Sequence, residues 1–381
     1  MTSAPSPEAP GQPAPPPAPP VVPFSLGYRP SLDGLRGVSI LAVMLYHLGL
    51  IRGGFLGVDI FFVLSGFLIT TLLTDEWIRS GSISFRKFYM RRALRLLPAL
   101  VVLAITCDFA TVIIARLYWP PEAFVPVVFG MAYASLVALF YVTNWVMISG
   151  QTLWILGHTW SLSIEEQFYV LWPLCLLALL KWIRHRGLIL SFLTLGIAAS
   201  LILRIALVRA HAPVTRVFVG LDTRFDELLI GCMVGVLCSW GLLATSRRSQ
   251  LLVAAGAVAG AATLAVLLWK ASSKEPAMLQ GGLTVAAGSA GVLIADIVAR
   301  PAGWLARALG REPLVGIGRI SYGLYLWHFP IVYSCGALII DGTRPDLLRA
   351  ALAIGLTFVA AIASFWWVER PMLRLKRRFE P

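Results

Sequence analysis

Long apolar runs recur along almost the whole chain, and they restrict its possible folds more than any other feature. Eleven such runs begin near residues 36, 55, 97, 124, 161, 187, 224, 250, 279, 320 and 348. A helix of about 20 apolar residues crosses the hydrocarbon core of a bilayer. Hydrophobic residues make up 58% of the chain and charged residues only 13%, against roughly 45–50% and about 25% in soluble domains. The pattern argues against a soluble enzyme, a fibrous protein and a nucleic-acid binder, and it predicts an all-α integral membrane protein.

Basic residues predict which ends of these helices face the cytoplasm, because Lys and Arg gather in short cytoplasmic loops. Six of them lie in the loop at 79–95, which follows the first two runs. If the run at 124–146 crossed the membrane, the later basic clusters at 181–186, 247–248 and 374–378 would all face outward. If that run lies at the interface or re-enters the bilayer, these clusters return to the cytoplasmic side. We therefore expect about ten transmembrane helices, one additional re-entrant or interfacial segment, and both termini inside.

The two ends of the chain differ from the apolar middle. The first 23 residues hold ten prolines, one charge and no basic start of a signal peptide, so we expect a disordered, Pro-rich cytoplasmic tail over residues 1–27. Residues 28–370 are expected to form the membrane domain, and residues 371–381 a basic cytoplasmic tail. The five cysteines lie in apolar runs without CxxC spacing, so they predict neither disulfides nor a metal site.

Arg36, His47 and Asp59 are the first polar residues that need an explanation, because an ionisable group in hydrocarbon costs roughly 2.5–3.5 kcal/mol. His47 follows Arg36 by eleven residues, or about 16 Å of helix. His47 lies six residues before Gly53 and Asp59 lies six after it, so antiparallel helices would hold both at one depth. A carboxylate beside a histidine stabilises the imidazolium that a general base forms. The alternative is a buried core histidine and an aspartate that caps the second helix.

Arg91, Arg92 and Arg95 lie just before the third spanning run. Their spacing puts Arg91 and Arg95 on one helix face, with Arg92 adjoining. Guanidinium groups bind phosphate through paired hydrogen bonds, which suits a nucleotide-bearing donor such as coenzyme A. The alternative is an ordinary positive anchor at the cytoplasmic surface.

The segment 158–169 brings His158, Trp160, Glu165 and Glu166 to the start of another run. The pattern Ser163-x-x-Glu166 also fits a capping box, in which the two side chains satisfy free amides at a helix start. That structural interpretation accounts for Glu166. It leaves Glu165 and His158 without an explanation.

Near the end of the chain, Ser321, Tyr325 and His328 recur on one helix face. A polar stripe in a membrane span faces protein or water, so it either lines a substrate tunnel or holds helices together. Arg224 opens the run near 224 together with two carboxylates, which are favourable at a helix N-terminus; binding an acceptor is the alternative role. Ser65 lacks the GxSxG pattern, so we do not expect a serine nucleophile there.

Five of these motifs follow one another over residues 28–370. They are Leu32-Asp-Gly-Leu-Arg36-Gly with His47, Gly54 to Ile69, the RRxxR run at Arg91, Thr159 to Tyr169, and Ser321 to His328. In this order the set resembles membrane acyltransferase family 3, the integral-membrane O-acyltransferases of bacterial surface glycans and some antibiotics. The resemblance implies a core of ten helices, in agreement with the topology drawn from the basic residues. Many relatives continue into a periplasmic hydrolase-like domain, and we expect its contribution to acceptor handling to be absent or to come from elsewhere.

The resemblance also implies roles for single residues, with His47 as the base and the RRxxR arginines holding the acyl donor. The candidate catalytic residues are His47, Asp59, Arg36, Glu165 and Glu166. The candidate donor-binding residues are Arg91, Arg92, Arg95 and Arg36, and the candidate substrate-binding residues are His158, Trp160, Tyr325 and His328.

We therefore expect an enzyme of the bacterial inner membrane, embedded in lipid, with no nucleic-acid partner and no metal. It would move an acyl group, acetyl above all, from cytoplasmic acyl-CoA directly to a hydroxyl of a glycan, glycolipid or small-molecule acceptor. The alternative is a transporter or flippase that uses His47, Asp59, Glu165 and His328 as a proton or solute pathway. The arginine run favours the enzyme, because a transporter has no need of it.

Overall fold

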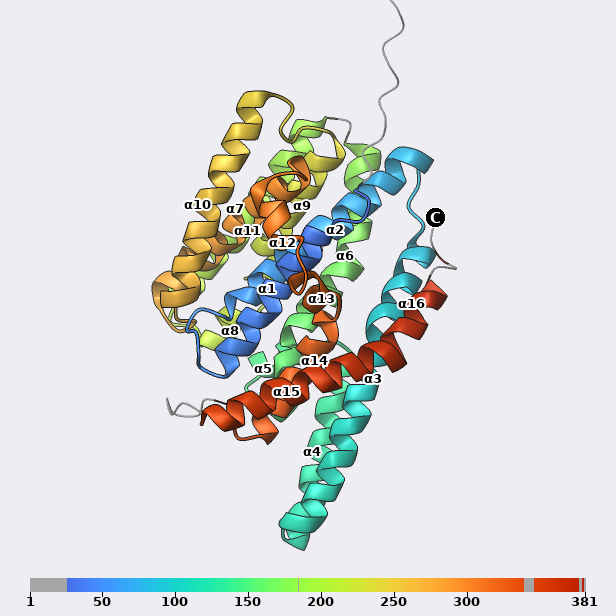
Figure 1. Ribbon diagram of the computed structural model, residues 1–381, viewed down its shortest axis with the longest axis vertical. Coiled ribbons are helices and arrows are strands. Elements are labelled where there is room, and N and C mark those ends of the chain that lie inside the picture. The colour runs from blue at the N-terminus through green and yellow to red at the C-terminus, as the bar shows by residue number, and fades with distance from the viewer. Residues whose placement is uncertain (1–25, 184, 339–345, 377–378, 380–381) are drawn as a thin grey trace, which may run out of the picture.

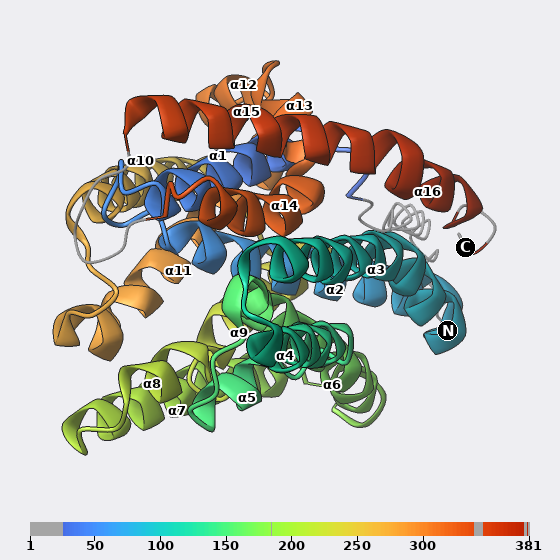
Figure 2. The same ribbon diagram turned by 90° about the horizontal axis from the view of Figure 1, so that it is seen from below.

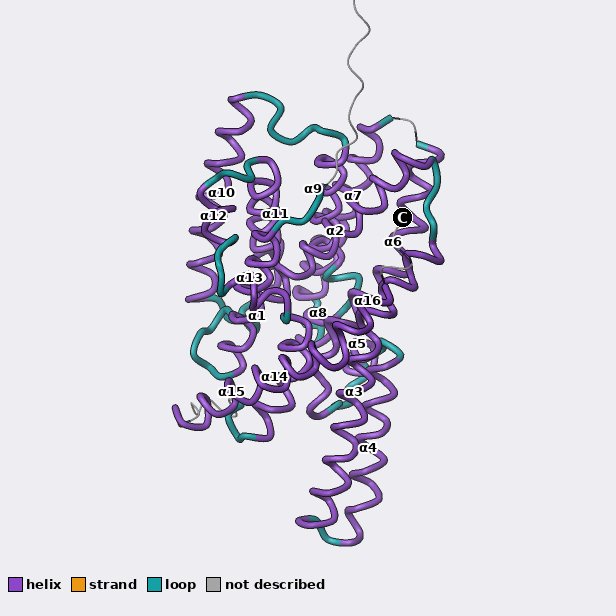
Figure 3. Tube along the Cα trace, turned by 45° about the vertical axis from the view of Figure 1, so that its right-hand side comes forward, coloured by secondary structure: helices purple, strands orange, loops and turns teal. Residues whose placement is uncertain are grey.

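The structure is a computed structural model, and it describes residues 26–183, 185–338, 346–376 and 379. Within these ranges all regular secondary structure is helical (Figure 3), which confirms the all-α prediction. Almost all of the tail expected over residues 1–27 lies outside the described residues. Residues 371–376 of the expected basic tail lie in a helix, Arg370–Lys376, that contacts the third helix of the chain.

The first half of the chain contains the helices that carry most of the predicted motifs. They are α1 (Pro30–His47), α2 (Leu56–Ser80), α3 (Phe85–Tyr118), α4 (Pro121–Leu139), α5 (Thr143–Ile148), η1 (Trp154–Thr159) and α6 (Trp160–Trp182). The helices from α7 to α11 follow. They are α7 (Arg186–Arg209), α8 (Val214–Val219), α9 (Phe225–Ser239), α10 (Arg247–Lys270), η2 (Met278–Gly282) and α11 (Leu283–Ala299).

The last part of the chain runs back over the first helices. Its elements are α12 (Trp304–Leu309), α13 (Leu314–Arg319), α14 (Ser321–Ser334), α15 (Leu347–Ser364), η3 (Phe365–Glu369) and α16 (Arg370–Lys376). α14 contacts α1, α3, α15 and η1, and Figure 2 shows it beside α1 and α3. This packing brings the motifs near residues 36, 91, 158 and 325 into one region of the molecule.

Eight helical stretches among the described residues are long and apolar enough to cross a membrane. They are α2, α3, α4, η1 with α6, α7, α10, η2 with α11, and α15 with η3 and α16. The predicted count of about ten is therefore not confirmed. α9, with 15 residues, and α14, with 14, are shorter than these stretches. Because both are largely enclosed by other helices, protein rather than lipid surrounds most of their length.

α4 covers most of the segment 124–146 that we expected to make no net crossing. It returns along the C-terminal half of α3, and the two form a hairpin that projects from the rest of the molecule (Figure 1). Its length and composition would allow it to cross a membrane. The C-terminal half of α3 and the whole of α4 thus lie outside the main helix bundle, whereas α6 lies within it.

Glycines allow two helix crossings that orient the candidate site. A Cβ at Gly66 of α2 would overlap the carbonyl oxygen of Leu228 in α9, and one at Gly318 of α13 would overlap that of Asp33 in α1. Small residues let helix backbones approach this closely. The first crossing fixes which side of α2 faces α9, and the second brings Arg36 next to Ser321, the first residue of α14.

Candidate active site

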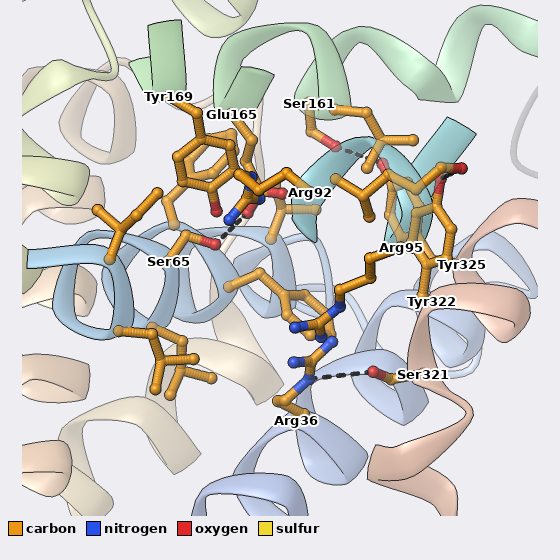
Figure 4. A pocket seen from close by; sticks show the side chains of 18 of the residues that line it. Arg36, Ser65, Arg92, Arg95, Ser161, Glu165, Tyr169, Ser321, Tyr322 and Tyr325 are labelled. Atoms are coloured by element: carbon orange, nitrogen blue, oxygen red, sulfur yellow. Dashed lines mark hydrogen bonds between the residues drawn. The ribbon is translucent and has the colours of Figure 1, made fainter. Parts of the chain in front are cut away.

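Four arginines line a cavity of about 180 Å³ between α1, α2, α3, α6 and α14, which we call the arginine cavity. Arg36 comes from α1, and Arg91, Arg92 and Arg95 come from the start of α3. Figure 4 shows the side chains of Arg36, Arg92 and Arg95 with those of Ser65, Glu165 and Tyr169. The predicted donor-binding residues therefore share one cavity, although α1 and α3 are far apart in sequence.

The arginines differ in their partners. Arg92 lies 3.3 Å from Glu166 Oε1, and its guanidinium carbon is 3.2 Å from the centre of the Tyr169 ring. Arg91 donates a hydrogen bond of 2.8 Å to the carbonyl oxygen of Phe379. Both arginines are thus held in place by groups of the protein.

Arg36 and Arg95 both line the arginine cavity, and Figure 4 shows their guanidinium groups side by side. Arg36 donates a hydrogen bond of 3.2 Å to Ser321 Oγ. Neither arginine forms an ion pair within the described residues. Two guanidinium groups held together without an ion-paired carboxylate have the charge and the donors that an anion such as phosphate prefers.

The two neighbouring glutamates of α6 point to different partners. Ser65 Oγ donates a hydrogen bond of 2.5 Å to Glu165 Oε1, and both residues line the arginine cavity, whereas Glu166 pairs with Arg92. The capping-box alternative for Glu166 is wrong, because α6 begins at Trp160 and the Ser163 hydroxyl bonds to the Thr159 carbonyl inside the helix.

A second, larger cavity of about 560 Å³ adjoins the first, and we call it the histidine cavity. His47 of α1, His158 of η1 and Trp160 of α6 line it. The two cavities share Val58 and Tyr325 on their walls. Tyr325 is fixed at this junction, because its hydroxyl donates to the His158 carbonyl at 2.7 Å and bonds to Ser161 Oγ at 2.6 Å.

His328 completes a cluster of three imidazole rings but does not line either cavity. Its ring centre is 5.1 Å from that of His47 and 5.5 Å from that of His158. It is completely buried. His328 lies behind the two histidines that face the cavity. Its position therefore does not support the predicted role in binding substrate directly.

Asp59 does not pair with His47, and that prediction is wrong. Asp59 is completely buried, and its Oδ2 lies 3.3 Å from Nη2 of Arg224 at the start of α9. His47 instead donates from Nδ1 to the carbonyl oxygen of Val43 in its own helix, at 3.0 Å. Equal depth did not make the two side chains face each other, because successive residues turn by about 100° around a helix. Val58 lines both cavities, so Asp59, the next residue along α2, points away from them toward α9.

The chain is similar to proteins of a known family. A family model described as an acyltransferase domain matches residues 29–367. The chain belongs to membrane acyltransferase family 3. The match covers the arginine cavity, the histidine cavity and the junction between them.

Curated relatives within the family carry informative names. The chain is 35% identical over 365 residues to the peptidoglycan O-acetyltransferase OatA of Listeria monocytogenes, which covers 92% of this chain and 56% of that protein. It is 34% identical over 360 residues to the O-acetyltransferase OatA of Staphylococcus aureus, covering 92% and 58%. It is also 33% identical over 358 residues to the putative peptidoglycan O-acetyltransferase YrhL of Bacillus subtilis, covering 91% and 55%. The chain thus spans little more than half the length of these relatives. No solved structure matches it.

This family member also contains a buried ionic cluster that the sequence revealed only in part. Arg224, Asp226 and Glu227 do open a helix, but all three are completely buried and none lines either cavity. Arg204 joins them, at 2.8 Å from Asp226. The sequence signal that could have identified Arg204 is its place as an arginine inside the apolar run near 187. With Asp59 the cluster links α2, α7 and α9, so its role is structural.

Glu369 is a second residue that sequence analysis missed. It is buried in η3, accepts a hydrogen bond of 3.3 Å from Ser364, and interacts electrostatically with Arg95 and Arg36. Only an acidic residue next to the last apolar run marked it. Among the described residues no group of three His, Cys, Asp or Glu side chains is arranged to hold a metal ion.

Proposed function

We propose that this protein is a membrane O-acyltransferase that moves an acetyl group from acetyl-CoA to a hydroxyl of a cell-wall glycan. The names of the relatives support O-acetyl transfer to peptidoglycan. The observation that carries the proposal is the junction at Val58 and Tyr325, where an arginine-lined cavity meets a histidine-lined one. Such a pair of cavities suits a reaction in which an anionic donor and a polar acceptor approach from opposite directions.

The donor would bind in the arginine cavity. Coenzyme A carries a diphosphate and a further phosphate, and guanidinium groups bind both strongly. Arg36 and Arg95, which form no ion pair among the described residues, would take the largest share. From Ser65 to Val58 the wall of the cavity follows two turns of α2, or about 10 Å. The pantetheine arm would follow that wall until the thioester reaches the junction.

The acceptor would bind in the histidine cavity. Its volume of about 560 Å³ suits a sugar unit, and Trp160 offers an apolar face for a sugar ring. Because the Nδ1 of His47 donates to Val43, its Nε2 is the basic atom of the neutral ring. His158 faces the same cavity and would bind a neighbouring hydroxyl.

Transfer would then be direct, without an acyl-enzyme, and would pass through a tetrahedral intermediate with His47 as the general base. The acceptor hydroxyl gives its proton to His47 Nε2 while its oxygen bonds to the thioester carbon. The carbon–sulfur bond breaks, and the leaving thiolate of coenzyme A takes the proton from His47. General base catalysis of this kind contributes typically 10²–10⁴-fold. Glu166 would act by holding Arg92, and Glu165 by holding Ser65 in the donor cavity.

The basic loops support an orientation for this reaction. Phe88, Arg91, Arg92 and Arg95 line the arginine cavity and belong to the basic segment 79–95. The positive-inside rule assigns that segment to the cytoplasm, where acetyl-CoA is made. The histidine cavity would then face the outer side of the bacterial inner membrane, with both termini inside. A cytoplasmic donor would thus reach an external acceptor without release of free acetyl groups.

The test uses the full chain in lipid nanodiscs with isotope-labelled acetyl-CoA and peptidoglycan fragments. The wild-type protein should add labelled acetyl groups to the fragments, and His47→Ala should lose at least about 10²-fold in rate. His211→Ala is the control, because His211 is exposed and lies in neither cavity. Transfer by His47→Ala at the wild-type rate would contradict the proposal.

A further inference from the structure

The cluster of three histidines holds more imidazole groups than the proposed transfer uses. His47, His158 and His328 come from α1, η1 and α14, and only the first two face the histidine cavity. The titratable groups that face the His328 ring are His47, His158 and Tyr325 of its own helix. No carboxylate faces it within the described residues, since Asp59 pairs with Arg224.

Hydrogen bonds fix the tautomer of each of the three rings. The Nδ1 atoms of His47, His158 and His328 lie 3.0, 3.2 and 2.6 Å from the carbonyl oxygens of Val43, Ile155 and Tyr325. A carbonyl oxygen only accepts, so each Nδ1 must carry the hydrogen. In the neutral rings all three Nε2 atoms are therefore acceptors.

Two of these acceptors are buried without a donor. Nε2 of His158 and Nε2 of His328 have no hydrogen-bond partner within the described residues. Buried polar atoms are almost always paired, so an orphan of this kind needs an explanation. The neutral rings cannot satisfy one another, because each would offer only an acceptor. A second N–H appears in the cluster only when one ring becomes protonated.

We propose that His328 is the positioning residue that stabilises His47 in its protonated form, by accepting a hydrogen bond from the imidazolium that forms during acyl transfer. This inference rests on the proposed role of His47 as the base. Because Nδ1–H of His47 stays with the Val43 carbonyl, the hydrogen that His328 accepts is the Nε2–H that His47 has received from the acceptor. With the two ring centres 5.1 Å apart, a small rotation of the His47 ring turns this N–H from the cavity toward His328, and the reverse rotation returns it to the thiolate. His328 thus takes the place that sequence analysis gave to Asp59, with a neutral acceptor instead of a carboxylate. When the thiolate takes the proton, His47 becomes neutral again and the bond ends.

Two substitutions of His328 separate this role from a merely structural one. His328→Gln carries an amide oxygen near the place of Nε2 and keeps an acceptor for His47. His328→Asn reaches only the place of Nδ1, so it can still donate to the Tyr325 carbonyl but offers nothing to His47. The pH dependence of the transfer rate is measured for both in nanodiscs, with acetyl-CoA and peptidoglycan fragments as substrates.

We expect His328→Asn to lower kcat by about 10- to 100-fold, the effect of one hydrogen bond to a charged group. Without the acceptor the imidazolium is less stable, so the acidic limb of its pH–rate profile should move to lower pH, by about one unit for a tenfold effect. His328→Gln should keep the wild-type profile and most of the rate. If His328→Asn does not fold, His328→Leu, which also lacks the acceptor, should show the same shift.

Three results would overturn the inference. The first is a fall in kcat of His328→Asn with an unmoved acidic limb, which indicates a structural role. The second is the same loss in His328→Gln as in His328→Asn. The third is a rise in KM for the glycan with unchanged kcat, which makes His328 an acceptor-binding residue. The proposed function fails separately, if His47→Ala remains active.

Discussion

Replacing Arg95 by Gln should weaken donor binding without destabilising the protein. Arg95 lies beside Arg36, and neither has an ion pair among the described residues. The substitution removes a guanidinium that the proposal assigns to phosphate, and each such bond contributes about 1.5–3 kcal/mol. The Kd for acetyl-CoA should therefore rise about 10- to 100-fold. Removing one of two like charges also relieves repulsion, so the protein without donor should be at least as stable as the wild type.

Arg92→Gln is the informative comparison, because Arg92 has a partner. It pairs with Glu166 at 3.3 Å, and about one fifth of each side chain is exposed. Gln would leave a carboxylate largely buried and unpaired, which costs about 1–3 kcal/mol, and partial exposure favours the lower end. Arg92→Gln should thus lower the melting temperature of the protein, whereas Arg95→Gln should not.

Both quantities are measured on the purified full chain in detergent. Titration calorimetry with acetyl-CoA gives the Kd, and thermal unfolding without donor gives the stability. Arg116→Gln is the matched control, because Arg116 lies on the same helix, is exposed and lines neither cavity. The reasoning is refuted if Arg95→Gln binds acetyl-CoA as tightly as Arg116→Gln, or if it loses as much stability as Arg92→Gln.

Two further substitutions test the fold around the site. Asp59→Asn should destabilise the protein by about 3–5 kcal/mol in chemical denaturation, because it leaves the buried charge of Arg224 poorly paired. It should not move the pH–rate profile, since Asp59 does not contact His47. A shifted profile would instead support a catalytic pairing of Asp59 with His47. Gly66→Leu should prevent folding, measured as loss of a monodisperse peak in size-exclusion chromatography, because its Cβ alone would overlap the backbone of α9. Gly130→Leu, with open space around its Cβ, should fold normally, and equal behaviour of the two would count against the close crossing.

Much of the site could be predicted from the sequence, because polar residues in apolar runs are few and each needs a reason. Arg36, Arg92 and Arg95 line one cavity, and His47 and His158 line the next. Spacing along a single helix sufficed for the arginine run. The family resemblance supplied the link between motifs that lie far apart in the chain.

What could not be predicted depends on how helices rotate against one another. The sequence places Asp59 and His47 at matching distances from the turn between their helices, but the glycine crossing of α2 with α9 turns Asp59 toward Arg224. Arg204 and Glu369 depend on contacts across the bundle that no local pattern shows. The number of crossings was also difficult to predict, because helices such as α9 are largely enclosed by other helices and need not match the thickness of a bilayer.

A structure of the protein in nanodiscs with a non-reactive acetyl-CoA analogue tests the central claim most directly. The account predicts the diphosphate between Arg36 and Arg95 in the arginine cavity. It also predicts the acyl carbon at the junction of Val58 and Tyr325, on the side from which His47 is reached. An analogue bound in the histidine cavity, or one whose acyl carbon lies away from the junction, would contradict it.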